Sequence, residues 1–172
     1  MPDRVAVLGG GVVQQFDTPE NVYHRPANQF TATVVGSPPM NFIPCTFDTS
    51  NGAVRVVHPD FSVRVHATTA ASGAIVDGAS CVLGVRPEDV QLVTGDISAD
   101  ANVFVTEPLG GETVVDLHLG GQVVKALTAP AQAPEPGSDV RVSFDALRLH
   151  VFDGGSGAAI MSAAGSDGVF DV

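Results

Sequence analysis

The chain has 172 residues, of which 44% are hydrophobic and 16% charged, and its 19 acidic and eight basic residues give a formal charge of -11 at pH 7. Such a length fits one domain, or one domain with part of a second, and the composition is that of a soluble globular protein. The negative charge disfavours nucleic-acid binding, and no apolar run approaches the roughly 18 residues that span a bilayer. Because no secretory signal follows Met1, we expect a cytoplasmic chain that does not insert into a membrane and reaches one only through a partner.

The first elements predicted along the chain are a β-hairpin and a short helix. Apolar runs at 4–8 and 12–16 flank three glycines, a pattern typical of two strands joined by a tight reversal. Thr18 is the expected N-cap of the helix, and Pro19 occupies the first helical position, where a missing N–H costs nothing. Pro26 ends this helix near Arg25.

A second helix is predicted over residues 27–35, after which Gly36 offers the C-cap conformation. The two prolines that follow force a stiff, extended exit and set the direction of the next segment. We interpret this stretch as a rigid interdomain elbow. It comprises Gly36, Ser37, Pro38, Pro39, Met40, Asn41 and Phe42.

From residue 42 onward the hydrophobic pattern has a period of two, which predicts an all-β region of the barrel or sandwich type. The predicted strands cover 42–47, 53–57, 61–65, 80–85, 90–93, 102–106, 113–119, 123–127, 140–144 and 147–152. A flexible loop is expected over 129–136. Residues 154–172, rich in Gly, Ser and Ala, are expected to form a flexible tail with little to bury.

The sequence lacks the residue patterns of common catalytic and metal sites. It has no phosphate-binding loop of the Gly-x-x-x-x-Gly-Lys type, no nucleophile elbow and no metal-ligand spacing among its histidines. His118 and His150 are expected at outward strand positions. Cys45 and Cys81 are expected to be small buried side chains, with a single disulfide as the alternative. We therefore predict no catalytic residue, metal or cofactor in this chain.

Two turns contain candidate docking or ligand-binding residues. The stretch GVRPEDV at 84–90 is either a strand end and turn with local ion pairs, or an exposed docking loop. The stretch EPLGGETVVDL at 107–117 is either a bend between two strands or a glycine rim that a ligand can approach closely. The candidate residues are Arg86, Pro87, Glu88, Asp89, Glu107, Pro108, Gly110, Gly111 and Glu112.

Four stretches of the chain together resemble one protein family. The stretch DRVAVLGGGVVQQFDTPENVYHRPANQFTATVVGSPPMNFI is similar to the end of the nucleotide-binding domain in ABC importer ATPase subunits of the sugar and glycerol-phosphate type. LGVRPEDVQL, EPLGGETVVDLHLGGQ and SFDALRLHVFD resemble the transport-associated, OB-like regulatory barrel of the same subunits. The likeness covers residues 3–153 in order.

The resemblance implies a mainly β fold, with an OB-like barrel preceded by a hairpin and two short helices. It divides the chain into a nucleotide-binding-domain remnant at 1–36, a regulatory barrel at 37–153 and the tail at 154–172. The resembled subunit binds ATP and Mg, pairs as a dimer and serves membrane subunits at the inner membrane. The phosphate loop, signature sequence, catalytic glutamate and switch histidine have no counterpart here, so we expect a non-catalytic regulatory and dimerisation region, open to a regulatory protein.

Two other functions are considered. A barrel that senses a small oxyanion or phosphosugar could use backbone N–H groups at Gly110 and Gly111, although the negative charge and single lysine argue against it. Single-strand nucleic-acid binding needs aromatic platforms in a basic groove, and the chain has no Trp and one Tyr.

The first 35 residues are too few to form a stable core alone. We expect them to pack on the barrel, to self-associate or to stay partly disordered. Exposed apolar side chains that would favour a partner are expected at Val5, Val7, Leu8, Phe30 and Val34.

Overall fold

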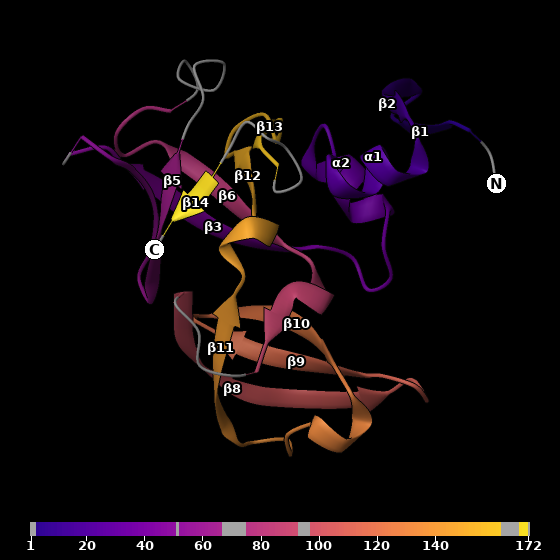
Figure 1. Cartoon of the computed structure of the whole chain (residues 1–172), viewed down its shortest axis with the longest axis vertical. Helices are drawn as coiled ribbons and strands as arrows, with labels where there is room; N and C mark the ends of the chain where they lie inside the picture. The colour runs from indigo at the N-terminus through magenta and orange to yellow at the C-terminus, as the bar shows by residue number, and fades with distance from the viewer. Residues whose placement is uncertain (1–2, 51, 67–74, 93–96, 163–168, 172) are drawn as a thin grey trace.

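The computed structural model describes residues 3–50, 52–66, 75–92, 97–162 and 169–171, and it is mainly β (Figure 1). The strands are β1 Val5–Gly9, β2 Val12–Asp17, β3 Asn41–Asp48, β4 Val54–His58, β5 Phe61–His66, β6 Ser80–Val85, β7 Val90–Gln91, β8 Ile97–Pro108, β9 Thr113–Leu119, β10 Gln122–Thr128, β11 Asp139–Phe144, β12 His150–Asp153, β13 Ala159–Met161 and β14 Val169–Asp171. The helices are α1 Pro19–His24 and α2 Gln29–Val34, with 3-10 turns η1 Pro87–Asp89, η2 Pro130–Gln132 and η3 Ala146–Arg148.

The strands form three sheets. A seven-stranded sheet has the order β13-β12-β6-β3-β4-β5-β14, and a five-stranded sheet has the order β10-β9-β8-β11-β7. The hairpin β1-β2 is a separate two-stranded sheet and lies beside α1 and α2, away from the five-stranded sheet (Figure 1). The mainly β architecture predicted from the two-residue pattern is confirmed.

The predicted N-terminal elements form where local signals place them. Thr18 caps α1 by accepting a hydrogen bond from the Asn21 backbone N–H at 3.2 Å, with Pro19 in the first turn. The second helix is shorter than predicted. It begins at Gln29 because the Asn28 side chain accepts a bond from the Thr31 N–H at 2.9 Å and so acts as the N-cap.

Several strand boundaries differ from the sequence prediction by one or two residues, and the two larger differences have identifiable reasons. Strand β8 starts at Ile97 rather than 102, because its early inward positions are Ala99 and Ala101, which are buried but give a weak hydrophobic signal. Residues 146–148 form η3 instead of the start of a strand. The Asp145 carboxylate accepts a bond from the Leu147 N–H and turns the chain there.

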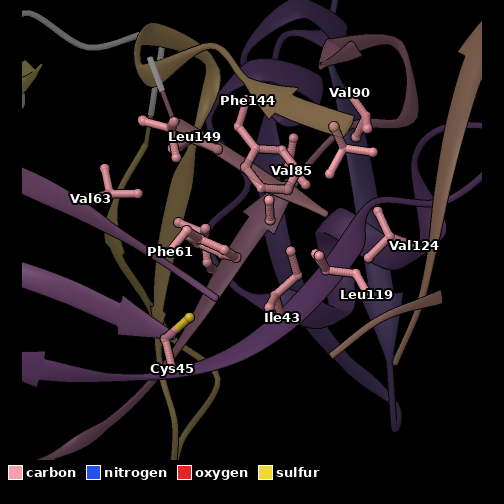
Figure 2. Close-up of a cluster of buried hydrophobic side chains, with 14 of the residues drawn as sticks. Ile43, Cys45, Phe61, Val63, Val85, Val90, Leu119, Val124, Phe144 and Leu149 are labelled. Atoms are coloured by element: carbon pink, nitrogen blue, oxygen red, sulfur yellow. The ribbon is translucent and has the colours of Figure 1, made fainter. Parts of the chain in front are cut away.

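One hydrophobic core joins the five-stranded and seven-stranded sheets. Phe61 of β5 packs against Phe144 of β11 with ring centroids 5.3 Å apart, and Figure 2 shows these rings among Ile43, Val85 and Leu149. The two cysteines are buried, free and directly opposite each other on β3 and β6. The expectation of small buried thiols is therefore confirmed.

The elbow after α2 is held by burial of the residues that follow the prolines. Gly36 has φ +121°, a region that side-chain-bearing residues rarely enter. Met40 is buried in a second apolar cluster with Ala32 and Phe152, and Phe42 makes an edge contact with Phe152 at 5.7 Å. The chain leaves α2 abruptly because these side chains must enter that cluster.

Asn41 fastens the elbow to the five-stranded sheet. Its Nδ2 donates to the Lys125 backbone oxygen at 2.8 Å, and its Oδ1 accepts from the Lys125 N–H at 2.7 Å. The carboxamide thus pairs with β10 as a peptide group of a neighbouring strand would. Two long-range hydrogen bonds therefore link the two sheets at this point.

Replacing Asn41 with alanine is expected to lower the free energy of unfolding by about 2 kcal/mol, because both backbone groups of Lys125 lose their partner. Urea unfolding followed by circular dichroism measures the loss. The control is Thr46→Ala on the same strand, where the side chain is exposed and the change should stay below about 0.5 kcal/mol. Equal losses in the two variants would contradict this account of Asn41.

The first part of the expected tail is ordered structure. Residues 154–157 turn the chain, β13 pairs with β12, and Met161 is buried. The backbone also pairs with the N-terminal segment, since the Gln29 N–H donates to the Gly157 oxygen and the Ala159 N–H donates to the Ala27 oxygen, both at 2.9 Å. These backbone bonds, which composition does not reveal, hold the segment. Residues 163–168 and 172 lie outside the described residues.

The N-terminal segment packs on the rest of the chain with one face and exposes the other. Leu8, Phe30 and Val34 are exposed as expected, whereas Val5 is half-buried and Val7 is buried, contrary to the prediction. Three further large apolar side chains of the hairpin are exposed, namely Val12, Val13 and Phe16. An exposed apolar face of this kind is typical of an interaction surface.

Candidate functional site

The turn after β6 places Arg86 at the junction between the N-terminal segment and the β sheets. The side chain is 2% exposed and occupies the position before η1. Its Nη1 donates to the backbone oxygens of Ala32, at 3.3 Å, and Val35, and its Nη2 donates to the Tyr23 oxygen at 2.8 Å. One guanidinium therefore satisfies carbonyls at the ends of both helices.

The Arg86 guanidinium also stacks on the Tyr23 ring, and its position requires a glycine at residue 36. Its guanidinium carbon lies 4.1 Å from the centre of the Tyr23 ring, a cation–π contact. A Cβ placed on Gly36 would lie 2.7 Å from Arg86 Nη1. Gly36 is thus required by its backbone angle and by the space that the guanidinium occupies. We call the contact of Arg86 with the backbone of α1 and α2 the Arg86 joint, or simply the joint. Arg86 and Pro87 are buried there, so the candidate docking loop at 84–90 is not exposed at these two residues.

The acidic residues of η1 lie on the outer side of the joint. The Tyr23 hydroxyl donates to Glu88 Oε1, and burial, together with this bond, raises the pKa of Tyr23 to about 12. Burial and the neighbouring Glu88 charge raise the pKa of Asp89. The turn and α1 therefore bring an arginine, a tyrosine and two carboxylates into one compact group.

His150 lies beside this group and is buried, contrary to the outward position predicted from strand alternation. It is 3% exposed, and burial, with the nearby charges of Arg86 and His24, lowers its pKa to about 4. His150, Val151 and Phe152 point to alternate faces of the sheet and are all buried, so both faces of β12 are covered. A strand buried on both faces usually reads as a continuous apolar run, and the polar His150 interrupts that run here, so the sequence favoured an outward position.

A cleft of about 200 Å³ opens between α1, η1 and η3. It is lined by Tyr23, His24, Arg86, Glu88, Asp89, Leu147, Arg148 and His150. Sequence reasoning found Arg86, Glu88 and Asp89 but missed the residues that α1 and η3 contribute. These come from segments more than 60 positions apart, as in the Arg86–Tyr23 bond, and only folding brings them together.

The second candidate rim forms the tip of the β8-β9 hairpin. The Leu109 N–H donates to the Glu112 oxygen at 2.7 Å and closes the turn. Glu107, Pro108 and Glu112 are exposed, and a Cβ on Gly110 or Gly111 would meet nothing within 4 Å. This tip contributes no residue to the cleft at Arg86, so the two rims are separate surfaces.

Other kinds of site are not found in the described part of the chain. Among those residues, no group of three or more His, Cys, Asp or Glu side chains could hold a metal ion. No helix there has the length and apolar character to cross a bilayer.

Two domain models match the sequence and define its class. The MalK OB fold domain matches residues 36–90, and the TOBE domain matches residues 83–152. Arg86, Glu88 and Asp89 lie in the overlap of the two matches. The chain therefore belongs to the OB and TOBE region of ABC importer ATP-binding subunits.

Named relatives agree with this class. The chain is 34% identical over 167 residues to the trehalose/maltose import ATP-binding protein MalK of Thermococcus litoralis and 39% identical over 171 residues to the xylose/arabinose import ATP-binding protein XacK of Haloferax volcanii. It is 36% identical over 171 residues to the sn-glycerol-3-phosphate import ATP-binding protein UgpC of Cupriavidus pinatubonensis. Each match covers 93% of this chain but only 42–45% of the relative, so the chain spans less than half the length of these proteins.

Proposed function

We propose that this chain is the non-catalytic regulatory and dimerisation region of an ABC importer ATP-binding subunit for a sugar or related solute. Residues 1–36 would end the nucleotide-binding domain, 37–153 would form the regulatory domain, and 154–172 would be its tail. ATP and Mg would bind to the preceding part of the subunit, and the chain itself would need no cofactor. The solutes for which the relatives are named, trehalose/maltose, xylose/arabinose and sn-glycerol-3-phosphate, support the solute class.

The observation that carries the proposal is the Arg86 joint. A regulatory domain influences an ATPase domain only if motion of one is transmitted to the other through a physical connection. Arg86 binds carbonyls of α1 and α2 from a turn of the β region, and Asn41 binds β10 from the elbow. Displacement of the β region would therefore carry the two helices with it.

The proposal includes partners and a location. Two copies would pair through the β region about a twofold axis, the usual symmetry of paired subunits. The subunit would be cytoplasmic and held at the inner membrane by membrane subunits, and a regulatory protein could dock on the exposed tip at Glu107, Pro108 and Glu112. The exposed face of the hairpin, including Val13 and Phe16, would be covered by the rest of the subunit.

A chimera tests the regulatory role. The chain replaces the matching C-terminal region of the Thermococcus relative, and ATP turnover and sedimentation are compared with a version that lacks residues 37–153. We expect the full chimera to hydrolyse ATP as a dimer and the shortened one to dimerise more weakly. Equal dimerisation of both would contradict the proposal, as would ATP turnover by the chain alone.

The alternative of an oxyanion or phosphosugar sensor at Gly110 and Gly111 receives no support from the geometry. A binding site needs a concave surface with converging donors. These glycines lie at an exposed hairpin tip with no atom near their open sides.

A further inference from the structure

The cleft between α1, η1 and η3 contains hydrogen-bonding nitrogens that the fold does not use. Arg86 Nε and His150 Nδ1 are buried and have no hydrogen-bond partner. Both residues line the cleft, and both are at least 97% buried. Leaving a buried polar atom without a partner costs roughly 1–3 kcal/mol, so two such atoms at one cleft call for an explanation.

Arg148 adds a charged donor on the exposed side of the cleft. It lies in η3, its side chain is exposed, and its guanidinium forms no salt bridge with another residue that the structure describes. A guanidinium presents a planar fork of N–H groups that matches carboxylate and phosphate oxygens. The cleft therefore has at its edge an arginine whose charge acts on Asp89, and in its wall two buried nitrogens without a hydrogen-bond partner.

The other wall of the cleft carries two carboxylates, Glu88 and Asp89. Glu88 accepts the Tyr23 hydroxyl hydrogen bond, and burial and the Glu88 charge raise the pKa of Asp89. An anion would therefore have to bind on the arginine side of the cleft, away from these two carboxylates. The volume of about 200 Å³ restricts the ligand to a small molecule or ion.

We propose that this cleft binds a compact oxyanion, a phosphate or a carboxylate, through Arg148, with Arg86 Nε and, in the tautomer protonated at Nδ1, His150 as further donors. The cleft is lined by residues of both the β region and α1, so it is complete only when the two are in contact. A ligand bound there would stabilise the joint by mass action. This regulatory consequence rests on the proposed function, whereas binding itself does not.

Calorimetric titration of the purified chain with inorganic phosphate, and separately with acetate, tests the proposal. Sodium chloride of matched ionic strength serves as the reference for screening. We expect at least one oxyanion to bind with a Kd below about 1 mM and Arg148→Gln to weaken it about tenfold. Arg141→Gln, which removes an exposed arginine outside the cleft, should leave the affinity unchanged.

Histidine ring signals in nuclear magnetic resonance spectra locate the ligand. The rings of His24 and His150 should shift on saturation, whereas His118, on the outer face of β9, should not. The proposal is overturned if neither oxyanion binds, if Arg148→Gln binds as the wild type does, or if His118 alone shifts. None of these results bears on dimerisation of the chimera, so the two proposals fail independently.

Discussion

Replacing Arg86 with methionine is expected to lower the free energy of unfolding by about 3–5 kcal/mol, more than the other substitutions considered. The carbonyls of Tyr23, Ala32 and Val35 would lose their donor in a buried joint. Methionine has a similar length and restores apolar packing, so the loss reports on the hydrogen bonds and the cation–π contact. Arg86→Lys should rescue little, because one ammonium cannot reproduce the fork that reaches two helices.

Urea unfolding measures the Arg86 effect, and limited proteolysis shows where it acts. The variant should be cleaved first within residues 18–36, because the joint is the connection of α1 and α2 to the β region. Arg141→Met is the matched control, since Arg141 is exposed and its contact with Asp100 spans 3.6 Å. That control should change stability by less than about 0.5 kcal/mol. Similar losses in both variants would show that Arg86 does not hold the joint.

The second large effect is a loss of stability in mild acid caused by His150. The pKa of this side chain is lowered from 6.5 to about 4 in the folded chain, so folding favours its neutral form. The contribution of His150 to the free energy of unfolding is therefore fully present above pH 6.5. It declines as the pH falls from 6.5 toward 4 and does not change further below pH 4. The shift corresponds to about 3 kcal/mol across this window.

Substitution with phenylalanine isolates the His150 contribution, because the ring is kept and the titrating group is removed. The pH dependence of the unfolding free energy should be shallower in His150→Phe than in the wild type between pH 6.5 and 4. Val151→Ala is the control. It should lower stability by about 2 kcal/mol at every pH, since it creates a cavity without changing a charge. If the unfolding free energy depends on pH in the same way in the wild type and in His150→Phe, His150 is not the cause of the loss of stability in acid.

Interactions between residues close together in the sequence are sufficient to predict the bounds of several helices and strands. Thr18 and Pro19 set the start of α1, and the period-two pattern predicted Ser80–Val85 and Thr113–Leu119 with their observed bounds. The sequence also placed Arg86 and the elbow among the candidate residues. What it could not show was that Arg86 is buried and linked to α1 and α2, because its partners are backbone oxygens, which carry no residue signature.

The sequence by itself determined the β-rich class, the short helices and the break at Gly36, because turns, caps and alternation act over a few residues. The tertiary structure alone decided that His150 faces inward, that residues 154–161 are ordered, and that α1 and η3 complete a cleft with Arg86. Each of these depends on contacts between distant segments. Such contacts depend on the packing of whole sheets, which a local pattern of polar and apolar residues does not specify.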